Sequence, residues 1–144
     1  MVSDCVLYYI DLIKQVNIGN YRGQKIFAKP IFILAIIDVI ERKCVVVNRF
    51  QYEDLQKVYS SIYKFYIGDK ETPMYKPFNY MQNDGFWHCQ MTDATIPLHS
   101  AKAIRGNVEY AYLDNALWDL LQEKDIRELV KSEIIRFFKL KPNN

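Results

Sequence analysis

The chain has 144 residues, of which 50% are hydrophobic and 15% aromatic, and this composition excludes an intrinsically disordered protein. Its formal net charge of +2 is too small to indicate a nucleic-acid partner by itself. The cysteines Cys5, Cys44 and Cys89 are widely spaced, so we expect buried thiols rather than a disulfide framework. The longest apolar run, residues 31–37, is too short to span a bilayer. These features predict a single-domain cytoplasmic protein with no membrane partner.

The first forty residues predict two helices separated by a loop. Ser3 or Asp4 can cap a helix that ends near residue 16. Residues 17–23 contain two glycines and are expected to form the loop. Pro30 fits the first turn of the second helix, which is apolar on nearly every side over residues 31–40. A helix without a polar face belongs in the middle of a domain.

The middle of the chain predicts β-type segments around a further helix. Residues 45–47 are three consecutive valines and are expected to form a short strand. Residues 51–68 show the apolar spacing of a helix. Residues 78–91 mix aromatic with polar side chains around Asp84-Gly85, which is a strong signal for a tight hairpin turn. The aromatic residues of this expected hairpin either contact a flat, charged partner such as nucleic acid or fill the core of a small sheet.

The last third of the chain begins with an ambiguous segment and ends in two helices. Residues 101–112 fit a helix at their start and a strand at their end. Asp114 and Asp125 mark the starts of the two closing helices. The fold class that we expect is therefore α+β and predominantly α-helical, a compact single domain with a small antiparallel β-hairpin.

The sequence offers no convincing catalytic constellation. His88 and His99 are the only histidines, and no cysteine lies at a spacing that would complete a zinc site with them. A Gly-rich phosphate-binding loop is also missing from the sequence. We therefore expect a binding module rather than an enzyme, with no cofactor and no metal.

Basic residues occur at the ends of the expected elements. At helix starts, a cationic side chain and the backbone N–H groups can both meet a phosphate. An ordinary scatter of solvated Lys and Arg is the alternative explanation. The residues that we expect to contact DNA are Lys29, Arg49, Lys76, Arg105, Arg22 and Lys25.

Several landmarks occur in a characteristic order along the chain. They are Lys29-Pro30 before residues 33–41, Pro77-Phe78 before Asp84-Gly85 and Trp87, and residues 110–114 before Leu117-Trp118. Their order and spacing resemble the sulfur-binding domain of phosphorothioate-dependent, McrA-like HNH restriction endonucleases. The similarity covers residues 25–138, so an N-terminal helix and loop (1–24) and a tail (139–144) complete one DNA-recognition domain over residues 1–144.

The resemblance implies a mostly helical domain that binds double-stranded DNA. It also implies a shallow apolar pocket for the sulfur of a modified backbone phosphate, surrounded by basic residues. Lys29 matches the basic residue before the helix proline, Pro77 matches a pocket proline, and Tyr80 falls at another pocket wall. We expect Pro77, Phe78 and Tyr80 to line this pocket.

Three positions differ from the pattern of that family. Ala28 stands where the family often has His, Lys76 where it often has Tyr, and Tyr80 where a small residue is common. The large Tyr80 side chain would narrow the pocket.

The expected function is the DNA-recognition module of a restriction or defence endonuclease. An HNH site needs several His and Asn or Asp residues around a metal ion, so the nuclease would lie in a further domain or a partner subunit. A homodimer is also compatible with the sequence. The alternative function is a protein-interaction domain without direct nucleic-acid contact, which dispersed charge around an apolar patch would favour.

Overall fold

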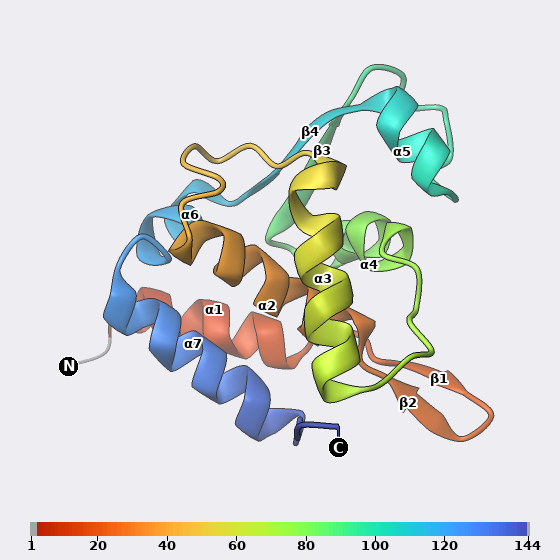
Figure 1. Cartoon of the computed structure of the whole chain (residues 1–144). Helices are drawn as coiled ribbons and strands as arrows, with labels where there is room; N and C mark the ends of the chain where they lie inside the picture. Colours follow the sequence, from red (N-terminus) through yellow and green to blue (C-terminus); the bar gives the residue numbers. More distant parts are fainter. Residues whose placement is uncertain (1–2, 144) are drawn as a thin grey trace.

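The computed structural model describes residues 3–143, whose elements surround one long buried helix, α2 (Figure 1). Seven α-helices, one 3-10 helix and two two-stranded antiparallel sheets lie in this part of the chain. The expected α+β class, mostly helical, is thereby confirmed. In chain order the elements are α1 (Asp4–Lys14), β1 (Gly19–Tyr21), β2 (Gln24–Ile26), α2 (Ala28–Glu41), α3 (Tyr52–Tyr66), α4 (Tyr75–Tyr80), the 3-10 helix η1 (Met81–Asp84), β3 (Trp87–Met91), α5 (Ala101–Asn107), β4 (Val108–Leu113), α6 (Asn115–Leu120) and α7 (Lys124–Phe137).

The helix α2 is buried along most of its length, as its sequence predicts. Eleven of its fourteen residues are buried, and α3, α4 and α7 pack against it. The helix ends where Lys43 takes a positive φ of 59°. The Lys43 N–H then donates to Ile40 O at 3.1 Å and the Cys44 N–H donates to Val39 O at 2.9 Å. These two bonds form a Schellman motif, which satisfies carbonyl groups at the helix end without a glycine.

Trp87 is the centre of an aromatic cluster that joins β3 to α2 and α4. Its ring centroid lies 5.2 Å from that of Phe32 and 5.5 Å from those of Phe50 and Phe78. The indole N–H donates a hydrogen bond of 2.8 Å to the carbonyl oxygen of Phe78. The cluster therefore fixes α4 against the sheet through both ring packing and a buried hydrogen bond.

The expected hairpin at residues 78–91 is wrong. Its first arm is helical, because α4 and η1 extend to Asp84, where Gly85 with φ 94° ends the 3-10 turn. Only β3 is a strand, and it pairs with the distant β4. Pro77 suits the first turns of a helix, and the aromatic side chains are required in the core. Of the two interpretations offered for the aromatic residues, the core-filling one is confirmed for Phe78, Phe86 and Trp87.

Other local predictions had mixed outcomes. The first helix is confirmed, with Ser3 accepting a hydrogen bond from the Val6 N–H. The expected loop at residues 17–23 instead contributes to the β1–β2 hairpin, in which Arg22 and Gly23 both have the positive φ that a type I′ turn requires.

The three valines at residues 45–47 form no strand. Val45 is buried, whereas Val46 and Val47 are exposed. The β propensity of the three valines was not enough to form a strand, because no neighbouring strand pairs with them. The ambiguous segment at residues 101–112 contains both expected structures, the helix α5 followed directly by β4.

The expectation of three buried thiols is wrong for two of them. Cys5 and Cys44 are exposed, because Cys5 lies on the outer side of α1 and Cys44 follows the end of α2. Cys89 on β3 is partly buried, and this burial raises the pKa of its thiol to about 12. Within residues 3–143, no helix is both long enough and apolar enough to cross a bilayer.

Replacing Trp87 by Phe should destabilise the fold by about 2–4 kcal/mol, because it opens a cavity in the cluster and leaves the Phe78 carbonyl without its donor. Urea denaturation followed by circular dichroism measures this loss. The matched control is Trp118→Phe, since Trp118 is only partly buried and touches Phe50 at the cluster's edge. Equal losses for the two variants would contradict the central role of Trp87.

Candidate nucleic-acid interface

The start of α2 is joined to the end of η1 by an ion pair. Lys29 Nζ lies 2.7 Å from Asp84 Oδ2, and the two side chains are only 13% and 10% exposed. A largely buried ammonium group requires such a counter-charge. The pair therefore explains the position of Asp84, and it means that the Lys29 charge is already neutralised inside the protein. The expected contact of Lys29 with DNA stays a prediction, and it would require a phosphate to take the place of Asp84.

The short helix α4 carries the residues that were expected to line a pocket. Phe78 is fully buried and Pro77 is buried, so these two residues support the surface from beneath. Lys76 and Tyr80 are exposed, and the Tyr80 side chain is 45% exposed. Because they are four residues apart on a helix, they share one outward side. This side of α4 presents one cation beside one aromatic ring.

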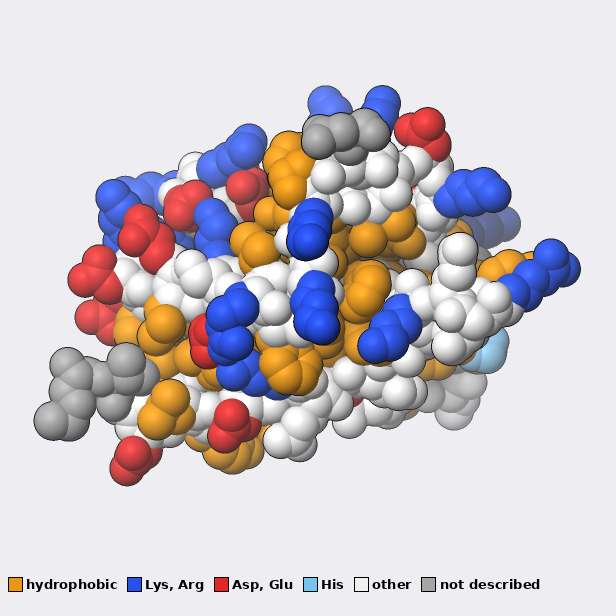
Figure 2. Space-filling view, turned by 90° about the horizontal axis from the view of Figure 1, so that it is seen from below, with side chains coloured by type: hydrophobic (Ala, Val, Ile, Leu, Met, Phe, Trp, Pro, Cys, Tyr) orange, Lys and Arg blue, Asp and Glu red, His pale blue; other side chains and the backbone are white. Residues whose placement is uncertain are grey.

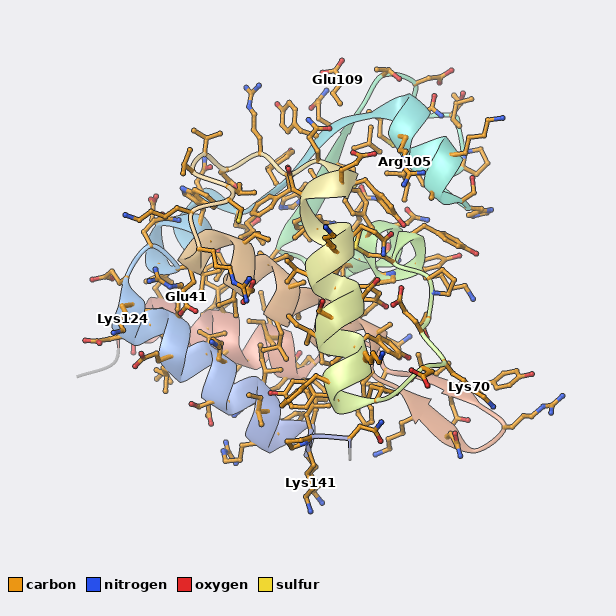
Figure 3. All side chains as sticks on the ribbon, viewed as in Figure 1. Glu41, Lys70, Arg105, Glu109, Lys124 and Lys141 are labelled. Atoms are coloured by element: carbon orange, nitrogen blue, oxygen red, sulfur yellow. The ribbon has the colours of Figure 1, made fainter. Side chains whose placement is uncertain are left out.

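Arg105 on α5 is held by the start of α3. Its Nε donates to Glu53 Oε1 at 2.8 Å, and its guanidinium lies over the Tyr52 ring at 5.1 Å. Figure 3 shows Arg105 between the ribbons of α5 and α3. Both members of this ion pair are well exposed, so it is weaker than the Lys29–Asp84 pair and can exchange Glu53 for another anion.

Arg22 and Lys25 lie on the β1–β2 hairpin, and both are exposed. The Arg22 guanidinium lies over the neighbouring Tyr21 ring at 5.2 Å. The hairpin projects from the body of the molecule (Figure 1), so its cations can reach a partner that does not touch the core.

The basic elements are unevenly distributed around the molecule. The β1–β2 hairpin, α4 and α5 all lie on the right-hand side in Figure 1; we call this side the basic edge. Figure 2 shows the molecule from below, with Lys and Arg side chains at the upper left, over the middle and at the right of that face, and Asp and Glu mainly at its left. Five of the six expected DNA contacts, all except Arg49, come from the basic edge or from the start of α2 behind it.

Arg49 belongs to the loop between α2 and α3. Its guanidinium lies 4.3 Å from the centroid of the Tyr110 ring on β4. Tyr110 therefore positions the sixth expected cation on the outside of the β3–β4 sheet.

One polar cluster was not found from the sequence. His88 Nε2 lies 2.6 Å from Asp114 Oδ1, and the Tyr9 hydroxyl donates to Asp114 Oδ2 at 2.9 Å. Burial and the hydrogen bond to Asp114 raise the pKa of Tyr9 well above its usual range. The three residues come from α1, β3 and the start of α6, so no sequence spacing could have indicated them. Asp114 was expected to cap α6 and instead uses its carboxylate to link these elements.

A search with the sequence found no matching family model and no matching curated protein. The structure, however, has a solved counterpart. The solved structure is described as "Sulfur binding domain of SprMcrA complexed with phosphorothioated DNA", and it matches with a TM-score of 0.66 over 92% of this chain and 84% of that chain. The two sequences are 14% identical, so the match establishes a shared fold and confirms at that level the resemblance that the landmarks indicated.

Removing the charge of Asp84 tests the largely buried ion pair. Asp84→Asn should destabilise the protein by about 3–5 kcal/mol, because it leaves the Lys29 ammonium without a counter-charge. Combining it with Lys29→Met should recover much of this loss, since the double variant buries no charge. Urea denaturation of the single and double variants gives the coupling energy.

The exposed Arg105–Glu53 pair supplies the control, for which Glu53→Gln should cost no more than about 1 kcal/mol. A cost for Asp84→Asn no larger than that of Glu53→Gln would show that the Lys29–Asp84 pair contributes nothing special.

Proposed function

We propose that this chain is a cytoplasmic DNA-recognition module of a restriction or defence endonuclease, and that it binds double-stranded DNA along the basic edge. The module reads a phosphorothioate or similarly modified backbone at α4. Cutting is the task of a nuclease domain or subunit outside residues 1–144. A single observation carries the proposal: Lys76 and Tyr80 expose a cation and an aromatic ring on one side of α4, in a fold whose solved counterpart was captured with phosphorothioated DNA.

The distribution of charge supports contact with a phosphate backbone. Exposed Lys and Arg residues neutralise phosphates and release the cations condensed on DNA. Lys76, Arg22 and Lys25 are exposed and form no ion pair with Asp or Glu within the described residues 3–143. Lys29 and Arg105 join them when a phosphate replaces Asp84 or Glu53 as the anion.

The exposed Tyr80 ring supports a preference for sulfur. Sulfur in place of a phosphate oxygen is larger, more polarizable and less hydrated, so an apolar surface favours it without any proton transfer. Tyr80 offers such a surface beside the Lys76 ammonium, and the buried Pro77 and Phe78 hold it in position from below. The module would therefore discriminate by contact with an exposed ring rather than by a deep pocket.

A protein-interaction domain is the second candidate, and one observation favours it. A cavity of about 230 Å³ opens between α2, α3 and α7, and most of its lining side chains are apolar. Phe65 and Ile62 of α3 contribute to this lining, and Phe65 is exposed. The cavity could accept an apolar side chain of a partner protein. The DNA-binding experiments below separate the two candidates.

Fluorescence anisotropy with a labelled duplex tests the basic edge. Between about 50 and 200 mM salt, affinity should fall roughly a hundredfold if about four phosphates are contacted. Lys76→Ala should weaken binding to plain and phosphorothioate duplexes equally and reduce the salt slope by about one.

Lys124→Ala is the matched control, because Lys124 is an exposed lysine at the start of α7, on the other side of the molecule in Figure 3. It should bind both duplexes like the unaltered protein. No binding of either duplex at low salt would overturn the proposed function and favour the protein-interaction domain.

The sulfur preference is tested separately at Tyr80. Tyr80→Ala should reduce the ratio of the affinities for phosphorothioate and plain duplexes by about fivefold, since about 1 kcal/mol of apolar contact with sulfur is lost. Binding to the plain duplex should change little. Tyr8→Ala is the control, because Tyr8 is a comparably exposed tyrosine on α1. An unchanged affinity ratio for Tyr80→Ala would exclude α4 as the place where sulfur is read.

A further inference from the structure

The β3–β4 sheet has a second side that the proposed duplex contact does not use. In its antiparallel register, His88 pairs with Tyr112 and Gln90 pairs with Tyr110. Side chains alternate across a sheet, so these four residues share one side, while Trp87, Ala111 and Leu113 on the other side enter the core. We call the side that carries His88, Gln90, Tyr110 and Tyr112 the outer sheet face.

The segment before α3 adds a third row to this face. Phe50 forms an antiparallel bridge to Ala111, with two backbone hydrogen bonds of 2.8 Å. Because Phe50 points into the core, its neighbours Arg49 and Gln51 point outward, next to Tyr112 and Tyr110. The outer sheet face therefore has three rows of two side chains each.

Arg49 is fixed in place from both sides. The Asn48 side chain donates to Leu113 O at 2.7 Å and accepts from the Leu113 N–H at 2.9 Å, so it imitates a strand residue. Together with the Phe50 bridge, these bonds hold the backbone on both sides of Arg49 against β4. The backbone at Arg49 is therefore held in place, and the Arg49 guanidinium lies over the Tyr110 ring at 4.3 Å.

The rings of the outer sheet face form a continuous ladder. The Tyr110 and Tyr112 centroids are 5.9 Å apart, and the Tyr112 and His88 centroids are 5.1 Å apart with an angle of 34° between the ring planes. His88 is held in its orientation by Asp114, and its side chain is still 37% exposed. With the Arg49 guanidinium at one end, the ladder presents four flat groups in sequence.

The charges around the ladder also suit a polyanion. Arg49 makes no ion pair with any carboxylate of the described residues 3–143. The Asp114 carboxylate beside His88 is already bound to His88 and Tyr9. Gln90 is an exposed amide at the rim and can donate to and accept from the edges of any base, whereas the Gln51 amide already donates to Glu109 O at 2.8 Å.

We infer that the outer sheet face binds the unpaired bases of single-stranded DNA. Bases stack on aromatic rings and on guanidinium planes, and an exposed sheet that carries such groups in a row is suited to successive bases of one strand. A base stacks on the exposed Arg49 guanidinium, which already rests on Tyr110, and the next bases meet the rings of Tyr112 and His88.

The choice of DNA rests on the proposed function, because a duplex held at the basic edge supplies a DNA strand to the neighbouring sheet. Gln51, on the outer sheet face, is separated along the chain by one residue from Glu53, the partner of Arg105. The outer sheet face and the basic edge therefore meet at the start of α3. An opened or overhanging end of the bound duplex would lie within reach of the ladder.

The experiment compares a labelled oligothymidylate of about 12 nucleotides with a blunt duplex, by fluorescence anisotropy on the whole chain. Tyr110→Leu and Tyr112→Leu replace a ring by an aliphatic side chain that still suits a half-buried strand position. Each should weaken oligothymidylate binding by about fivefold or more and leave duplex binding unchanged, because the duplex contact proposed at the basic edge includes neither these rings nor Arg49. Tyr8→Leu, which removes an exposed ring from α1, should change neither.

The outcomes separate this inference from the proposed function. Duplex binding without oligothymidylate binding, or oligothymidylate binding that both sheet variants retain in full, would overturn the inference alone. Tighter binding of oligouridylate than of oligothymidylate would overturn the choice of DNA.

Loss of duplex binding, with oligothymidylate binding that still depends on Tyr110 and Tyr112, would overturn the proposed function and support the outer sheet face as an independent site. Unchanged duplex binding by both variants, measured beside their weakened oligothymidylate binding, would also show that they are folded.

Discussion

The burial of α2 is the constraint on which the rest of the structure depends. Because this helix is apolar on almost every side, each of its sides must be covered, and α3, α4 and α7 do so. Phe32 of α2 packs against Trp87 of β3, so the β3–β4 sheet also covers part of this helix. The positions of the elements that surround α2 follow from this helix more than from their own propensities. A chain of this size can therefore present several different surfaces on one core.

Sequence patterns predicted the parts of the fold that local physics decides. Long segments with helical spacing became α1, α3 and α7, since a periodic apolar stripe survives in any packing arrangement, and the continuous apolar run after Pro30 became α2. The hairpin expected around Asp84-Gly85 failed because the turn signal was real but the preceding aromatic residues were needed as a helix against α2. The valines at residues 45–47 failed for the related reason that strand formation depends on a partner, and β4 is instead paired by Asn48 and Phe50.

The candidate site was less accessible to prediction, because its decisive contacts join residues far apart in the chain. The sequence correctly indicated the sulfur-binding-domain fold, and it singled out Lys76 and Tyr80, which prove to be exposed. It gave no sign that Asp84 would neutralise Lys29, that Glu53 would hold Arg105, or that Arg49 would lie on Tyr110. Each of these pairings depends on side-chain placement after folding. The sequence thus indicated which cations could contact DNA, and only the tertiary structure shows which of them are available to an external anion.

The ion pair between Lys29 and Asp84 affects how strongly the affinity for DNA would depend on ionic strength. A phosphate that displaced Asp84 from Lys29 would leave the carboxylate to gather a cation from solution, while the DNA shed one of its own. These two exchanges offset each other. Lys29 would then increase the affinity for DNA without making that affinity more dependent on ionic strength. The number of phosphates contacted would exceed the net number of cations released by one.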